Sequence, residues 1–168
     1  MNAIFTRTSV RTYSDKPIEQ DKREKILRAG MQAPSAGNQQ PWEFAVIDDP
    51  NMLEKLGKAT PYSAPTGRAT FAVVPLMRSE GLRFANLVQQ DMGACVENML
   101  LEATELGIGS VWQAVYPEQD RIDNVNKIIS TPEGLTPFCL VAFGYPEGGE
   151  LPAQKSRYDE SRVHVNGF

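Results

Sequence analysis

The chain contains very little histidine and cysteine, which limits the chemistry available to it. His164 is the single histidine among 168 residues, and Cys95 and Cys139 are the two cysteines. A Ser-His-Asp or Cys-His hydrolase would have to depend on His164 alone, so we do not expect hydrolase chemistry. The cysteines form no CxxC pair and no Cys/His cluster, so we expect no metal site. Buried structural thiols are the favoured interpretation, with a disulfide or a reactive thiol as the alternative.

The sequence also lacks a long apolar run and an excess of positive charge. No stretch reaches the roughly 18 apolar residues of a membrane helix, and the N-terminus MNAIFTRTSVR lacks the pattern of a signal peptide. The formal net charge is −4, so the surface as a whole does not attract polyanions. We therefore expect a cytoplasmic protein that binds neither membranes nor nucleic acid. Any phosphate site would need a local basic cluster.

Length and composition predict one packed domain. The chain has 168 residues, 41% hydrophobic and 23% charged, which is ordinary globular usage. We expect a single domain over residues 1–168. Its last part, 146–168, is rich in proline, glycine and charge and has no clear core face, so we treat it as a tail.

Apolar periodicity and capping signals predict interleaved helices and strands. Helices are expected at 19–32, 49–56, 86–106 and from Pro117 onward, and strands at 42–47, 70–77, 108–116 and 138–145. Pro75 suggests that the second strand ends there or lies at a sheet edge. Because regular βαβ units are missing, the fold class is α+β, with one sheet flanked by helices.

Two glycine-containing stretches have more than one interpretation. The small residues of 91–95 would let another helix approach closely, either within the chain or from a second subunit, and the sequence leaves both open. Gly107-Ile-Gly109 is not a dinucleotide-binding loop, because a helix precedes it and a strand follows, the reverse of what the pyrophosphate requires.

Three polar clusters lie outside the regular elements. Arg7-Thr-Ser-Val-Arg11 offers two guanidiniums and two hydroxyls that could grip a phosphate and a polar ring edge. The loop 34–38, followed by 40–42, carries Ser and Asn side chains between a helix and a strand. The third cluster is 155–157, Lys-Ser-Arg. Taken singly, each also has a purely structural interpretation: 7–11 as a capped surface turn, which is the favoured one for that cluster alone, 34–42 as a plain connector, and 155–157 as solvated charge.

In their order along the chain, these clusters resemble the nitroreductase family of flavoproteins, and the resemblance covers nearly the whole sequence. Arg7-x-Ser9-x-Arg11 is similar to the family's opening R-x-S-x-[RK] signature. Residues 34–42 are similar to its PSxxNxQPW loop, and 155–157 to its C-terminal KxR. The long helix 86–106 and the strand after it resemble the family's central dimer helix and following strand.

The resemblance implies a mixed, mostly antiparallel sheet, an FMN cofactor and a homodimer with the flavin between its subunits. Arg7 and the 155–157 cations would hold the phosphate, Ser9 the phosphate or ribityl chain, and Arg11 the pyrimidine edge. The loop 34–38 would arrive from the partner subunit. The implied cofactor-binding residues are Arg7, Thr8, Ser9, Arg11, Pro34, Ser35, Ala36, Asn38, Asp91, Gln113, Ala114, Lys155 and Arg157.

The implied reaction needs no catalytic side chain, because the flavin carries the chemistry. Backbone groups near Ala114 would orient flavin N5, which takes hydride from NADH or NADPH and passes it to a nitroaromatic, quinone or enone in a ping-pong cycle. The alternatives are another redox reaction on the same fold, such as dehydrogenation or reductive dehalogenation, and a non-catalytic flavin-binding or storage protein. One departure from the family concerns its helical insertion: only residues 78–85 stand in that place here, so we expect a more open acceptor site.

Overall fold

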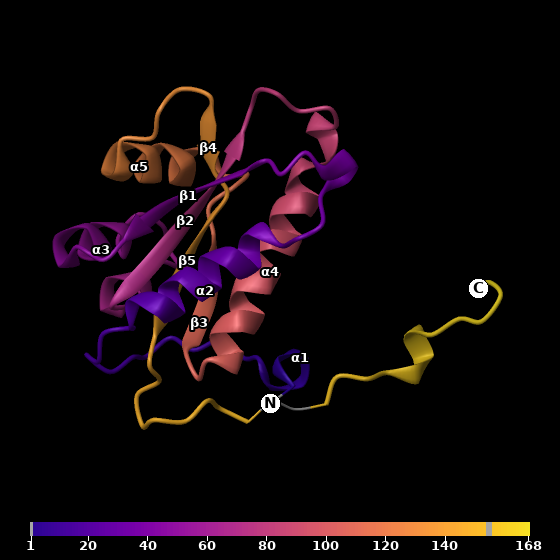
Figure 1. Cartoon of the computed structure of the whole chain (residues 1–168), viewed down its shortest axis with the longest axis horizontal. Coiled ribbons are helices and arrows are strands. Elements are labelled where there is room, and N and C mark those ends of the chain that lie inside the picture. The colour runs from indigo at the N-terminus through magenta and orange to yellow at the C-terminus, as the bar shows by residue number, and fades with distance from the viewer. Residues whose placement is uncertain (1, 154–155) are drawn as a thin grey trace.

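The computed structural model describes residues 2–153 and 156–168. One antiparallel sheet of order β1-β2-β5-β3, with β4 also paired to β2, carries helices on both faces (Figure 1). The predicted α+β class is confirmed. The helices and strands are α1 (Ala3–Thr6), α2 (Gln20–Met31), β1 (Trp42–Ile47), α3 (Pro50–Leu56), β2 (Phe71–Arg78), α4 (Val88–Glu105), β3 (Gly109–Ala114), α5 (Gln119–Ile129), β4 (Leu135–Pro137) and β5 (Cys139–Gly144).

Capping residues and apolar periodicity predicted several boundaries of helices and strands correctly. Strand β1 has its predicted bounds, and α3 begins with Pro50 after Asp49, whose carboxylate accepts a hydrogen bond from the Met52 amide at 2.9 Å. Helices α2 and α4 lie within two residues of their predicted ends. Helix α5 begins two residues after Pro117, and β4 was not predicted as a separate strand.

The sheet is buried on both faces. Helices α2 and α4 cover one face, where Phe71 and Val73 of β2 point. Helices α3 and α5 cover the other face, where Ala72 and Val74 point. Because neighbouring β2 side chains enter different cores, this strand is apolar at every position from 71 to 77.

The edge assignment suggested by Pro75 is wrong. Pro75 lies inside β2, which has neighbours on both sides. The register of β2 with β4 differs by one residue from its register with β5, so Phe138 and Cys139 both lie opposite Pro75. The Phe138 amide donates to the Pro75 carbonyl oxygen at 2.9 Å. At such a bulge the regular ladder is interrupted, so the missing N–H of proline is tolerated in a central strand.

The small-residue stretch 91–95 has two different sides. Cys95 faces α2, where a methyl group added at Gly30 would lie 3.2 Å from the Cys95 sulfur. Packing within the chain therefore explains that side. A methyl group added at Gly93 would meet nothing within 4 Å among the described residues, and Gly93 and Ala94 are partly exposed. That face of α4 is open in the single chain.

Both cysteines are free and fully buried, as the favoured interpretation predicted. Burial raises the pKa of Cys95 to about 12 and that of Cys139 well above its ordinary range. Neither thiol is accessible as a reactive group.

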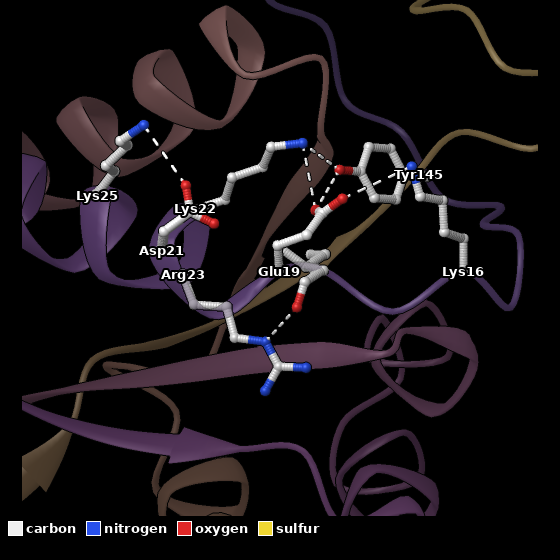
Figure 2. A network of polar contacts seen from close by, with 8 residues as sticks. Lys16, Glu19, Asp21, Lys22, Arg23, Lys25 and Tyr145 are labelled. Carbon is white, nitrogen blue, oxygen red and sulfur yellow. Dashed lines mark hydrogen bonds and ion pairs between the residues drawn. The ribbon is translucent and has the colours of Figure 1, made fainter.

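Tyr145, just after β5, joins the sheet to the segment before α2 (Figure 2). Its hydroxyl donates to a Glu19 carboxylate oxygen at 2.6 Å and accepts from the Lys22 ammonium at 2.6 Å. The Lys16 ammonium lies 4.1 Å from the centre of the Tyr145 ring. The hydrogen bond from Tyr145 is the main cause that lowers the pKa of Glu19 to about 2.

The C-terminal residues 156–168 run away from the sheet and its helices (Figure 1). They contain one 3-10 turn, Glu160–Arg162. Tyr158, Val165 and Phe168 expose their side chains to solvent. None of the described helices is both long and apolar enough to cross a bilayer.

Candidate functional site

The N-terminal segment adds a short stretch of pairing to the free edge of the sheet. Strand β3 pairs with β5 on one side only. On its other side Ser9 forms a parallel bridge with Ser110, and the Val10 amide donates to the Ser110 carbonyl at 2.9 Å. Residues 7–11 therefore run alongside β3 in the same direction.

The R-x-S-x-R motif has a motif residue at every second position, which is the spacing of side chains on one face of an extended strand. Val10 points inward and is 5% exposed, packed against Gly109 so closely that an added methyl group there would lie 2.8 Å from Val10 Cβ. Ser9 and Arg11, on the opposite side, are exposed. The buried Tyr13 hydroxyl donates to the Val10 carbonyl at 2.7 Å and fixes the segment.

Arg11 and the end of β3 line one cavity of about 370 Å³. The only side-chain hydrogen bond described for Arg11 runs from its guanidinium to the Ser9 carbonyl, at 3.4 Å. The guanidinium therefore stands beside the strand edge without an ion-pair partner among the described residues. The cavity is lined by Arg11, Tyr62, Pro65, Val111, Trp112, Gln113 and Ala114.

The side chain of Gln113 is engaged away from this cavity, and its backbone N–H and C=O face β5, because they alternate with those of Ser110, whose carbonyl faces the N-terminal segment. The side chain is 3% exposed and its amide nitrogen donates to the Thr66 hydroxyl at 2.9 Å. Rotating the amide would instead let the nitrogen reach the Ser63 carbonyl at 3.0 Å, so in either orientation Gln113 holds the 60–66 loop. Ala114 is exposed, and its carbonyl accepts a long bond of 3.5 Å from Arg121.

A second cavity, of about 650 Å³, brings the first arginine of the motif together with the tail. It is lined by Ile4, Phe5, Arg7, Glu97, Ser156, Arg157 and Tyr158. The Arg7 guanidinium pairs with Glu97 at 3.3 Å, and Arg157 is exposed. Thr8, next along the segment, is half-buried. Lys155 lies outside the described residues.

The loop 34–38 lies apart from both cavities. Asn38 borders a separate cavity of about 350 Å³, and no residue of 34–38 lines the cavity of Arg11 or that of Arg7. The loop is fixed internally, since the backbone N–H of Gln40 donates to the Ser35 hydroxyl at 3.0 Å. Pro34 is exposed and Ala36 half-buried. Within one chain, the predicted site residues of the loop 34–38 are therefore separated from those that line the two arginine cavities.

Asp91 is 5% exposed and bonds to this loop. One carboxylate oxygen accepts from the Ala36 amide at 2.9 Å and the other from the Gln39 side chain at 2.6 Å. Both oxygens are thus occupied by contacts within the subunit.

The family model described as the Nitroreductase family matches residues 4–86 and 61–145. The chain belongs to the nitroreductase family.

Several members of the nitroreductase family match along nearly their full length. An Archaeoglobus fulgidus protein with the provisional name NADH dehydrogenase/NAD(P)H nitroreductase is 38% identical over 166 residues, covering 98% of this chain and 95% of that protein. A crystal structure of a provisionally named NADH oxidase from Clostridium acetobutylicum has a TM-score of 0.95 and 40% identity, with 99% of each chain covered. An FMN-dependent nitroreductase from Clostridium difficile has a TM-score of 0.90 and 26% identity, again covering 99% of each chain. This nitroreductase-family chain is accordingly an NAD(P)H oxidoreductase by family.

Two features of this candidate site were not predicted from the sequence. Tyr62 lines the Arg11 cavity from the 60–66 loop, and the Arg121 guanidinium lies 5.4 Å from the Tyr62 ring centre. Thr60, Ser63 and Thr66, around Tyr62, are buried in the fold, but the sequence alone carries no signal of that burial.

Proposed function

We propose that the protein is an FMN-dependent oxidoreductase that works as a homodimer. Bound FMN would supply the hydride chemistry, between NADH or NADPH and a nitroaromatic, quinone or enone acceptor, in a ping-pong cycle. The observation that carries the proposal is the placement of Arg11 against the edge of β3 and of Arg7 with Arg157 in a second cavity, at the two ends of one extended segment. The FMN dependence of the Clostridium difficile relative supports it.

The cavity of Arg7 and Arg157 fits a phosphate. Two guanidiniums line it, and Lys155 is two residues from Arg157 in the sequence. Guanidinium forks bind phosphate oxygens with charge-assisted hydrogen bonds. Glu97 competes for Arg7, but its side chain is 48% exposed, so the ion pair is weak enough for a phosphate to replace it.

The Arg11 cavity fits the pyrimidine edge of a flavin. Arg11 places a fixed positive charge where negative charge develops when electrons arrive. Because the Ser110 carbonyl faces the N-terminal segment, the backbone groups of Trp112 and Ala114 face the same outer edge of β3. The Ala114 amide is thereby offered to the cavity and would orient the reactive edge of the ring. Neither role requires a protein acid or base.

A second copy of the chain would complete the site. The loop 34–38 lines neither basic cavity of its own chain, so it would contact FMN only from a partner subunit. The open face of α4 at Gly93 and Ala94 and the extended tail with its exposed Tyr158 and Phe168 provide apolar surface for that partner. We expect an interface well above the standard roughly 1,600 Å².

Flavin titration and sedimentation test this proposal together. The protein should bind FMN, sediment as a dimer at micromolar concentration, and oxidise NADH or NADPH when a quinone is added. A protein that only stores flavin would bind FMN without consuming the nicotinamide. A chain without measurable FMN affinity would refute the proposal, and a monomer that binds FMN would refute the shared site.

A further inference from the structure

The side chain of Gln39 bonds to two parts of the chain that lie far from it in sequence. Its amide nitrogen donates to an Asp91 carboxylate oxygen at 2.6 Å and to the Phe84 carbonyl at 3.1 Å. Its amide oxygen accepts from the Phe84 N–H at 2.9 Å. Both the nitrogen and the oxygen of this side-chain amide are therefore hydrogen-bonded. Gln39 donates to the backbone of residue 84 and also accepts from it.

Asp91 holds the other side of the same loop. Its second oxygen accepts the Ala36 N–H at 2.9 Å, so a single buried carboxylate bonds to residues 36 and 39 together. Asp91 stands in the first turn of α4, where the positive end of the helix dipole favours a carboxylate. If one of the partners of the buried Asp91 carboxylate is removed, the groups that remain lose hydrogen bonds they cannot replace with water. These hydrogen bonds therefore stabilise one another.

The Phe84 ring adds an aromatic contact to the hydrogen bonds between loop 36–39 and residues 84 and 91. The Phe84 ring lies against the loop so tightly that a methyl group added at Gly37 would be 2.6 Å from a ring carbon. The Arg83 guanidinium lies 5.1 Å from the centre of that ring. Residues 83 and 84 belong to the short link between β2 and α4. Loop 36–39 and this link are thus held as one body.

We propose that Gln39 and Asp91 are positioning residues that lock the 36–39 loop to Phe84 before the flavin binds. This inference rests on the proposed function, because the loop matters only if it contacts the partner's FMN. Asp91 then acts through the Ala36 amide and Gln39 instead of touching the flavin. A loop that is already ordered loses less conformational entropy on binding, so the lock should strengthen FMN binding.

The first test compares Gln39→Ala with Gln89→Ala in the FMN-loaded dimer. Gln89 is an exposed glutamine on α4, whose side chain donates to the Tyr116 hydroxyl at 3.2 Å. Gln39→Ala should weaken FMN binding by at least about tenfold and speed hydrogen exchange at the Ala36 and Phe84 amides, with the dimer intact. Gln89→Ala should change neither quantity. Faster exchange at those amides with unchanged FMN affinity would overturn the inference.

The second test exchanges the two polar groups. Asp91→Asn places an NH2 group opposite the Gln39 NH2, and Gln39→Glu places two carboxylates together, so each single substitution should weaken FMN binding. In the double substitution the amide at position 91 can donate to the carboxylate at position 39, so part of the affinity should return, while the Phe84 carbonyl still lacks its donor from residue 39. A double variant no better than the weaker single variant would overturn the lock. If the unmodified protein itself fails to bind FMN, the proposed function fails, and amide exchange alone then decides whether the lock exists.

Discussion

The side chain of Val10 fills the space beside Gly109, so that a methyl group at residue 109 would lie 2.8 Å from Val10 Cβ. Gly109→Ala should push the N-terminal segment away from β3, lowering the free energy of unfolding by about 1–3 kcal/mol and weakening FMN binding. Urea unfolding and flavin titration measure the two effects. Adding Val10→Gly should recover part of the FMN affinity, because it removes Val10 Cβ and both methyl groups from the contact; a fully stable Gly109→Ala protein would contradict this packing.

Arg11→Ala should alter the redox behaviour of the bound flavin more than its retention. The nearest fixed positive charge at the proposed pyrimidine edge would be lost, so the reduction potential of bound FMN should fall. Its reduction by NAD(P)H should slow by about 10²–10³-fold, the typical effect of removing one electrostatic donor. Potentiometry and stopped-flow reduction at saturating FMN measure both. Arg28→Ala, at an exposed arginine paired with Glu24 on α2, is the matched control; equal results for the two variants would remove Arg11 from the site.

Lys155 and Arg157 should govern retention of the cofactor. Charge-assisted bonds to a phosphate are worth about 1.5–3 kcal/mol each, so replacing both residues by alanine should weaken FMN binding well over tenfold. Glu97→Gln should have the opposite effect, because it releases Arg7 from its ion pair. Flavin fluorescence titration distinguishes these directions, and unchanged affinity in the double variant would refute the phosphate assignment.

A substitution at Gly93 tests whether α4 lies in the subunit interface. A Cβ added at this residue meets nothing within 4 Å among the described residues, and Gly93 is partly exposed, so we expect Gly93→Leu to leave the monomer fold intact. If α4 forms the centre of the dimer, the added bulk should separate the subunits and abolish FMN binding. Sedimentation and circular dichroism provide the two readouts. A Gly93→Leu protein that remains dimeric and yellow would place the interface elsewhere.

The Glu19 network predicts an acid-dependent stability. The folded pKa of Glu19, about 2, lies below its ordinary 4.5, so its contribution is complete above about pH 4.5 and is lost as the pH falls toward 2. Tyr145→Phe removes the main cause of the shift and should flatten the fall in Tm over this range. Thermal melts from about pH 2 to 6 measure it, and a Tyr145→Phe profile that falls as steeply as that of the unmodified protein would contradict the network. Lys16→Ala is the control: the Lys16 ammonium lies 3.7 Å from a Glu19 oxygen, beyond hydrogen-bond distance, so its loss should change the profile less.

Features set by neighbours in sequence were predictable. The Asp49 cap and Pro50 define the start of α3 through contacts within four residues. By contrast, the extended pairing of residues 9–11 beside β3 was not predicted, because it depends on Ser110, which is far away in the sequence.

Features that depend on distant partners were not predictable. In the sequence Gln39 is an ordinary loop residue. Its partners Phe84 and Asp91 are 45 and 52 residues away and contact it only in the folded chain. Tyr62 enters the Arg11 cavity only because Gln113 holds its loop. No periodicity or capping rule encodes such contacts.

Pro75 has a consequence for the chain before it has folded. From Phe71 to Met77 the strand carries no charge and is rich in β-formers, the composition that drives unfolded chains to pair with one another. A proline in such a segment cannot donate to a ladder, so a second copy could not extend a regular sheet past it. The native bulge opposite Phe138 and Cys139 accommodates Pro75 in the folded protein. We therefore expect Pro75 to disfavour pairing between unfolded chains while this apolar strand is still exposed.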